Sequence, residues 1–263
     1  MDDRVFVASL FKSGTWLLRH MVAGLTGLRA IEPPHGHGPA DYGDPGLIRF
    51  EPGAFFSWHS DISPQVADRL LAERARVVLL VRNVYDLAVS QYHHFARDVD
   101  ADIGRSAGQA DFLARFSRDD GLAMSICGYS APGASWPGLG PHLAQTARMM
   151  AFARDHGALI TSYERLVTRK EAELDRLAAF LGGAPDGAAR RALLNSSDFA
   201  AMKADAEKSG AGSHFRKGQP GQHREVLKPH HVFMVDHLIG EHAPDLRRLA
   251  ADLRMPEIVQ RLG

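Results

Sequence analysis

Short apolar runs alternate with amphipathic stretches along most of the chain. Four runs rich in β-branched and aromatic residues predict strands, at Arg4–Ser9, Ala54–Trp58, Arg76–Val81 and Ala158–Ser162. Arg76–Val81 is apolar at every position after its arginine, as expected for a strand covered on both faces in a parallel sheet. Strands that alternate with helices predict an α/β fold of three layers, α/β/α, around a central and mainly parallel sheet.

Amphipathic segments between and after these runs predict helices. Ser63 followed by Pro64 is typical of a helix start, and Gly182-Gly183 is typical of a helix end. Two segments, Glu32–Gly53 and Ala204–Gln222, are expected to be loops, the second of them mobile and basic. The expected helices are Thr15–Leu28, Ser63–Glu73, Asn83–Arg97, Ala110–Phe116, Leu139–His156, Lys170–Leu181, Ala184–Leu194 and, interrupted near Pro244, His230–Leu253.

The bulk composition limits the classes of function. A length of 263 residues suits a single domain over residues 1–263. The formal net charge is +0, so nothing in it favours binding to nucleic acid or to an anionic membrane. One cysteine, Cys127, excludes an intrachain disulfide and favours a reducing compartment. Because the N-terminal residues hold no long apolar run, we expect a cytoplasmic protein without a membrane anchor.

Fourteen histidines raise the question of a metal site. His35, His37 and the adjacent pair His230-His231 lack neighbouring carboxylates or cysteines in the sequence, so the pattern predicts no metal site.

Four polar side chains each come just after a predicted strand. They are Lys12, His59, Arg82 and Tyr163. The carboxyl ends of parallel strands lie at one edge of the sheet, where ligands of α/β proteins bind. The sequence therefore predicts one shared site at this edge.

The strand before Lys12-Ser13-Gly14-Thr15 and the helix after it outline a loop that could bind an anion. Gly14 lets the backbone approach an oxyanion, the helix offers free N–H groups, and the lysine adds a charge. The loop lacks the G-x-x-x-x-G-K-[ST] pattern of ATP- and GTP-binding loops. Taken alone, a plain turn explains these four residues equally well.

Two further segments carry groups that suit a phosphate. Arg82 ends a buried strand and Ser90 follows two helical turns later. Arg216-Lys217-Gly218 places two cations in a glycine-rich loop. Each has a simpler explanation when taken alone, namely an ion pair between Arg82 and Asp86 and a solvated basic loop.

In this order, the segments resemble the motifs of the sulfotransferases that use 3′-phosphoadenosine 5′-phosphosulfate (PAPS) as donor. The resemblance spans Val5 to about Leu227. It rests on the following likenesses: Lys12–Thr15 to the 5′-phosphosulfate loop P-K-S-G-T-T-W, Arg82–Ser90 to R-N-P-x-D-x-x-x-S, Arg216–Gly221 to R-K-G-x-x-G, Ser162–Leu166 to the Y-E-D-L segment, and Asp198–Lys203 to S-F-x-x-M-K.

The resemblance implies a role for each matching residue. In the family the first motif holds the 5′-phosphosulfate, the second and third hold the 3′-phosphate, and the last two lie near adenine. For this chain that implies Lys12, Ser13, Gly14 and Thr15 at the 5′ end, Arg82, Ser90, Arg216, Lys217 and Gly218 at the 3′-phosphate, and Tyr163, Ser197 and Phe199 around the base. The tryptophan of the first motif stacks on adenine in the family, which makes Trp16 a further candidate for that contact.

A histidine after the second strand of the family, commonly in K-T-H-L-P, implies that His59 is the catalytic base. An imidazole suits the task because its ordinary pKa is near neutral. His35, His37 and His93 are rival candidates. The implied reaction is a direct, in-line transfer from PAPS to a hydroxyl, assisted by Lys12, which leaves adenosine 3′,5′-bisphosphate (PAP) and needs no metal.

Several positions depart from the family pattern. Phe11 replaces the usual proline, and Trp16 stands one place before the usual tryptophan. Ser57 stands where many cytosolic members have a lysine, and Gln222-His223-Arg224 replaces the frequent D-W-K. The dimerisation segment is not recognisable, so the oligomeric state stays open.

Two other functions remain possible on sequence grounds. The first is a nucleotide or metabolite kinase with a degenerate loop, which would need Mg²⁺ ligands such as Asp86 or Asp61 after a second strand. The second is a non-catalytic PAP-binding protein of the same fold. The acceptor is not readable; a small metabolite, a phenol or a natural product would each supply the hydroxyl.

Overall fold

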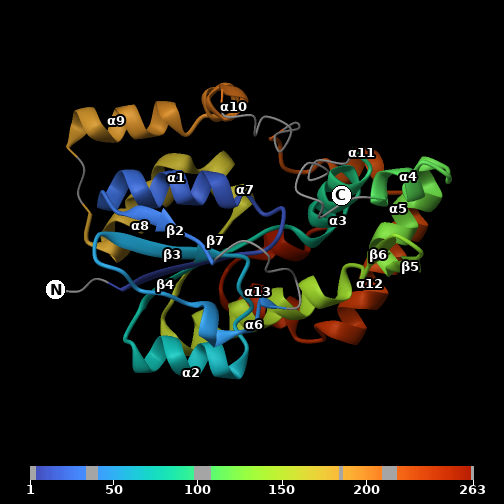
Figure 1. The fold of residues 1–263 in the computed structure, drawn as a ribbon, viewed down its shortest axis with the longest axis horizontal. Helices are drawn as coiled ribbons and strands as arrows, with labels where there is room; N and C mark the ends of the chain where they lie inside the picture. Colours follow the sequence, from blue (N-terminus) through green and yellow to red (C-terminus); the bar gives the residue numbers. More distant parts are fainter. Residues whose placement is uncertain (1–3, 34–40, 98–107, 184–185, 209–217, 262–263) are drawn as a thin grey trace. The chain divides into compact units, whose positions relative to one another are not determined.

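A parallel sheet forms the centre of the first part of the molecule (Figure 1). The computed structural model describes residues 4–33, 41–97, 108–183, 186–208 and 218–261. Within them, five parallel strands lie in the order β2–β3–β1–β4–β7. They are β1 (Val5–Ser9), β2 (Arg29–Ile31), β3 (Ala54–Trp58), β4 (Arg76–Val81) and β7 (Leu159–Ser162). The α/β fold with a mainly parallel sheet is thereby confirmed.

Contacts divide the chain into two compact units, and each unit combines two stretches of sequence. The first is Met1–Arg82 with Arg148–Ala204, and the second is Asn83–Ala147 with Asp205–Gly263. The first holds the whole parallel sheet. The single-domain expectation stays a prediction.

Helices cover both faces of the sheet in the first unit (Figure 1). On one face lie α1 (Thr15–Thr26), α7 (Tyr163–Thr168) and α8 (Lys170–Leu181), and α2 (Pro64–Ala72) lies on the other. Val7 of β1 packs into the core that α1 and α8 close, whereas Phe6 stacks on Phe56 with ring centroids 5.7 Å apart. Because both faces are covered, every residue of β1 is buried, which explains the apolar run from Val5 to Ala8.

The second unit is mainly helical. Its centre is α3 (Val84–Phe95), ten of whose twelve residues are buried. Around it pack α4 (Gln109–Leu113), α5 (Arg118–Cys127), α11 (His223–Val226), α12 (Pro229–His242) and the 3₁₀ helix η5 (Pro256–Val259). The unit also contains α13 (Leu246–Asp252) and the antiparallel hairpin β5 (Tyr129–Ala131) with β6 (Ala134–Trp136). The helix α6 (Gly140–His156) contributes to both units.

Some predicted boundaries are wrong for identifiable reasons. Helix α1 ends at Thr26 because Gly27 takes a left-handed conformation, and β2 follows with two exposed residues and no apolar run to reveal it. The expected loop from Ala204 begins instead inside α10 (Phe199–Lys208). The sequence also missed α5, α7 and the β5–β6 hairpin, which are short and carry weak periodicity, and the 3₁₀ turn η2 (Pro45–Leu47). Helix α9 (Gly187–Ser196) lies close to its predicted place.

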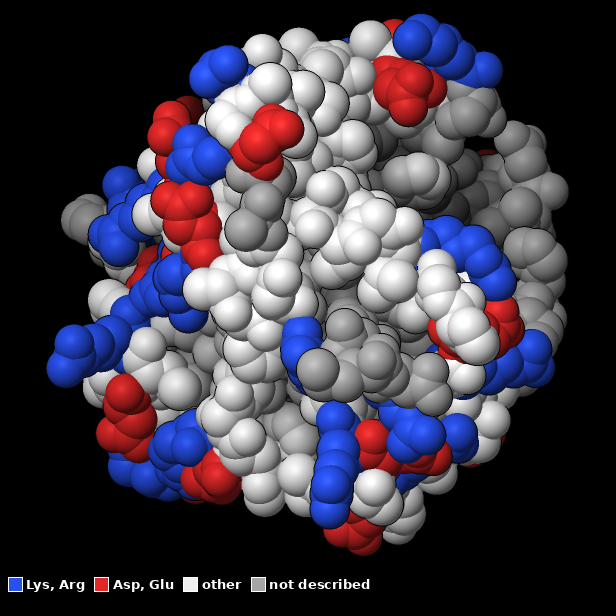
Figure 2. Space-filling model, turned by 90° about the vertical axis from the view of Figure 1, so that its left-hand side faces the viewer, with Lys and Arg blue, Asp and Glu red and all other residues white. Residues whose placement is uncertain are grey.

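The charged side chains of both signs are interspersed over the face that Figure 2 presents. Among the described residues, no helix has the length and apolar composition needed to cross a membrane.

Candidate functional site

The loop between β1 and α1 has the geometry of an anion site. Gly14 is the N-cap of α1 at φ 97°, and no side chain caps the helix there. The first turn contains no acidic residue, so the positive end of the helix dipole has no carboxylate beside it in that turn. Lys12 precedes the cap and is half-buried.

The hydroxyl groups of Ser13 and Thr15 make hydrogen bonds within the protein. Both the N–H and the O–H of Ser13 donate to the carbonyl of Leu10, at 3.1 and 2.7 Å, and Ser13 is fully buried. The Oγ atoms of Thr15 and Ser9 are 2.7 Å apart. Ser13 therefore shapes the turn, and its contact with a donor stays a prediction.

Arg82 and Tyr163 lie against this loop. Lys12 has a left-handed φ of 68°, a conformation that costs a non-glycine residue about 1–2 kcal/mol. Nη1 of Arg82 donates to the Lys12 carbonyl at 2.8 Å, and the guanidinium carbon lies 4.6 Å from the centroid of the Tyr163 ring. A Cβ placed on Gly14 would approach that ring to 2.5 Å. The loop thus needs glycine at position 14.

His59 follows β3 and is oriented by Ser9. Its Nδ1 lies 3.3 Å from both the Oγ and the carbonyl oxygen of Ser9. A carbonyl only accepts, so the ring proton lies on Nδ1 and Nε2 carries the lone pair. That is the tautomer a general base requires. Because Ser9 also contacts Thr15, the buried Ser9 side chain touches both His59 and the first residue of α1.

Aromatic rings surround the His59 imidazole. The ring centroids of Phe11, Tyr42 and Trp58 lie 5.6, 5.9 and 5.8 Å from that of His59. Trp58 is buried, whereas Phe11 and Tyr42 are half-buried.

Three residues expected near adenine have different environments. Tyr163 is 9% exposed and packs among core residues of the first unit. Ser197 is buried, and its hydroxyl donates to the carbonyl of Leu194 at 2.9 Å. Phe199 is half-buried at the start of α10. Trp16, in the first turn of α1, is 49% exposed.

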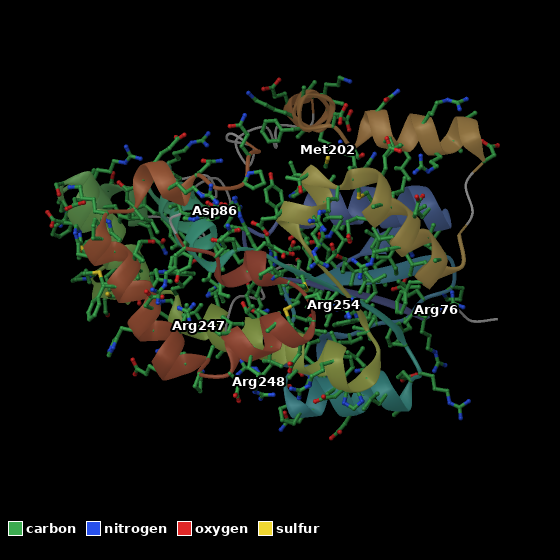
Figure 3. All side chains as sticks on the ribbon, turned by 180° about the vertical axis from the view of Figure 1, so that it is seen from behind. Arg76, Asp86, Met202, Arg247, Arg248 and Arg254 are labelled. Atoms are coloured by element: carbon green, nitrogen blue, oxygen red, sulfur yellow. The ribbon has the colours of Figure 1, made fainter. Side chains whose placement is uncertain are left out.

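In the second unit, the carboxylate of Asp86 binds the chain at Gly221, the last glycine of the glycine-rich motif, and at His223. It accepts from the N–H of Gly221 at 2.5 Å and from the N–H and Nδ1 of His223 at 2.8 and 2.9 Å. The Asp86 side chain is completely buried (Figure 3 labels it). From the sequence, Asp86 was expected only as an ion-pair partner of Arg82 or as a magnesium ligand. Its hydrogen bonds to Gly221 and His223 were not predicted.

The remaining predicted residues are only partly described. Ser90 is half-buried in α3, and Gly218 has a left-handed φ of 67°. His93 lies in the same helix with its ring 5.2 Å from that of Tyr92. Arg216, Lys217, His35 and His37 lie outside the described residues.

A family model for the sulfotransferase domain matches residues 54–247 of the chain. The chain belongs to the sulfotransferase family. The family inferred from the five motifs is thereby confirmed. Among curated proteins, none matches the chain.

Solved sulfotransferase structures have the same fold. Mouse sulfotransferase SULT7A1 complexed with PAP is similar at a TM-score of 0.67 and 18% identity, over 97% of this chain and 89% of that one. Retinol dehydratase is similar in two complexes, one with androsterone and inactive cofactor PAP (TM-score 0.59, 20% identity) and one with retinol and PAP (0.61, 19%). Each covers 92% of this chain and 81% of the other.

Nothing in the sequence singled out Arg19, a cation near the end of β3. Arg19 of α1 donates from Nε to Ser57 Oγ at 2.8 Å and from Nη2 to the Ser57 carbonyl at 2.9 Å. It also pairs with Glu32. Burial lowers the pKa of Arg19 to about 10, which leaves it charged at neutral pH. A guanidinium from α1 therefore reaches position 57, where many relatives have a lysine.

The structure corrects one argument about the histidines. Asp119 lies beside the pair His230-His231, and one ligand-type atom from each lies within 4.8 Å of the others. However, His231 Nδ1 accepts from the N–H of Lys228 at 3.2 Å, so the proton is on Nε2, 3.1 Å from the Asp119 carbonyl. A protonated Nε2 cannot bind a metal, and the Lys228 ammonium lies 3.0 Å from the Asp119 carboxylate. This geometry favours a capped helix start for α12.

Proposed function

We propose that this sulfotransferase transfers the sulfuryl group of PAPS to a hydroxyl of a small acceptor, with His59 as the base. The observation that carries the proposal is the contact of Ser9 with both Thr15 and His59. It places a histidine with its Nδ1 on Ser9 beside a lysine-bearing loop and a helix start that no side chain caps. Sulfuryl transfer needs both groups, because the loop and the helix start can hold an anion and the histidine can remove a proton.

In the proposed reaction the acceptor hydroxyl loses its proton to Nε2 of His59 as its oxygen attacks the sulfur in line. The bond from sulfur to the phosphate oxygen breaks, and PAP leaves. Lys12 and the N–H groups at the start of α1 stabilise the charge that develops on the leaving phosphate. The Nδ1 hydrogen bond to Ser9 keeps the imidazole oriented while it becomes charged.

The donor would be held by groups from several motifs. The Lys12 ammonium and the backbone N–H groups of Gly14 and Thr15 would bind the 5′-phosphosulfate. The exposed ring of Trp16 would stack on the adenine. Arg82, Ser90, Arg216, Lys217 and Gly218 are assigned to the 3′-phosphate from their motifs, and Tyr163, Ser197 and Phe199 to the neighbourhood of the base. The scheme needs no metal, because lysine, arginine and the helix dipole supply the positive charge.

We propose an apolar or aromatic hydroxyl compound as acceptor. The rings of Phe11, Tyr42 and Trp58 around His59 support this choice, because such rings favour planar and apolar partners. The relatives known by structure include complexes with androsterone and with retinol, both of them apolar alcohols. With one cysteine and no spanning helix in its described part, we expect the protein in the cytoplasm.

The test is a transfer assay with PAPS and a panel of phenols, sterols and polar sugars, followed by release of PAP. The proposal predicts turnover with phenols or sterols and none with sugars, unchanged by a metal chelator. Turnover with ATP and Mg²⁺ in place of PAPS would support a kinase instead. PAP binding without transfer to any acceptor would support a non-catalytic binding protein.

A further inference from the structure

The phosphate loop contains a strained residue whose carbonyl is held by a buried arginine. Lys12 has φ 68°, and its carbonyl accepts from Nη1 of Arg82 at 2.8 Å. The Arg82 side chain is 7% exposed. A left-handed lysine persists only where its surroundings fix it, and this hydrogen bond is a direct restraint on it.

Tyr163 restrains the same loop from the next position. Its ring lies on Gly14, where a Cβ would come within 2.5 Å, and the guanidinium of Arg82 lies 4.6 Å from the ring centroid. Gly14, Tyr163 and Arg82 thus pack one on another. The packing follows from the sheet, because Val81 pairs with Ser162, so the next residues of β4 and β7 emerge side by side.

We propose that Arg82 and Tyr163 are positioning residues that hold the phosphate loop in its anion-binding conformation. The inference rests on the proposed function, and it adds a role for Arg82 besides the 3′-phosphate. Binding at the 5′ end of the donor then depends on Arg82 even for a nucleotide that lacks the 3′-phosphate. An arginine that only contacts the 3′-phosphate would have no such effect.

The first test needs no ligand. Amide hydrogen exchange is measured for the N–H groups of Ser13, Leu17 and Leu18, which donate to the carbonyls of Leu10 and Gly14. In Arg82→Ala we expect these amides to exchange on the order of tenfold faster or more. The matched control is Arg76→Ala, at the other end of the same strand, whose guanidinium donates to the Leu181 carbonyl at 2.6 Å (Figure 3). It should leave the loop amides unchanged.

The second test compares two nucleotides by calorimetry. Arg82→Ala should weaken ADP binding on the order of tenfold and PAP binding at least as much. Ser90→Ala, a change at the 3′ subsite alone, should weaken PAP and spare ADP. Tyr163→Leu, which leaves Arg82 in place, should weaken both nucleotides and should also speed exchange of the same loop amides without ligand, which a contact between Tyr163 and adenine alone would not do.

The outcomes separate the two proposals. Unchanged exchange in Arg82→Ala, together with wild-type affinity for ADP, would overturn the positioning role. If Arg82→Ala does not fold, wild-type ADP affinity in Tyr163→Leu would do the same. A wild-type protein that binds neither PAP nor ADP would refute the proposed function instead, and the exchange result would still decide whether the loop depends on Arg82.

Discussion

Buried polar groups are used differently in the two units of this sulfotransferase. In the first, Ser9 and Arg82 are buried directly behind His59 and Lys12, which are half-exposed and can meet a ligand. In the second, the buried Asp86 carboxylate accepts hydrogen bonds from Nδ1 of the buried His223 and from the backbone N–H groups of Gly221 and His223. Buried polar groups in the first unit therefore support residues of the proposed site, whereas Asp86 in the second unit holds the backbone of Gly221 and His223 in place.

The largest effect that the comparison predicts is at His59. His59→Ala should lower kcat by about 100-fold or more, because it removes the proposed general base. PAP affinity should barely change. Steady-state kinetics and calorimetry on the same preparation check both values. Full activity in His59→Ala with loss of activity in His93→Ala would move the base to His93.

Asp86 should matter for stability rather than for chemistry. Asp86→Ala leaves the N–H of Gly221 and the buried His223 without their acceptor, so we expect a loss of about 3 kcal/mol in the free energy of unfolding. Urea denaturation measures this value. The matched control is Asp245→Ala, whose exposed ion pair with Arg248 should contribute less than about 1 kcal/mol. Equal losses in the two variants would contradict the structural role of Asp86.

His142 should make the stability of the protein depend on pH in the acid range. Burial lowers the pKa of His142 from 6.5 to about 4, so the unfolded chain binds the proton more readily. Stability should therefore fall as the pH falls from about 6.5 toward 4, by about 2 kcal/mol at pH 5. In His142→Gln this part of the slope should disappear. His156→Gln, which removes an exposed histidine of the same helix, should keep it; a slope that is the same in all three proteins would refute the assignment.

Trp16 carries the smallest expected effect. Since its side chain is 49% exposed, Trp16→Ala should change the free energy of unfolding by less than about 0.5 kcal/mol. If the ring stacks on adenine, PAP affinity should fall by about tenfold, in line with the energy of base stacking on an aromatic side chain. Unchanged affinity would remove Trp16 from the base site.

The sequence predicted the strands and the helix that flank the candidate site residues Lys12 to Thr15 and His59. An apolar strand followed by Lys12-Ser13-Gly14-Thr15 and an amphipathic run indicated the loop, because strand, turn and helix are contiguous in the chain. The position of His59 after β3 was readable for the same reason. Both elements were found where they were expected.

Contacts between distant parts of the chain were not readable. Asp86 and Gly221 are 135 positions apart, and Arg82 and Lys12 are 70 apart, so no spacing rule connects them. Arg19 looked like an ordinary helix residue until the structure placed it on Ser57 of a different element. The left-handed backbone conformation of Lys12 could not be predicted, because a lysine in this sequence does not require it.

The central claim is that the chain binds a nucleotide with phosphates at both the 3′ and 5′ positions. The most direct measurement is a thermal-shift titration of the purified protein with PAP, beside ADP and ATP with Mg²⁺. Because a ligand of the folded state raises the melting temperature with its concentration relative to Kd, the account predicts a clear shift with PAP and a smaller one with ADP. A shift with ATP and Mg²⁺ and none with PAP would contradict it.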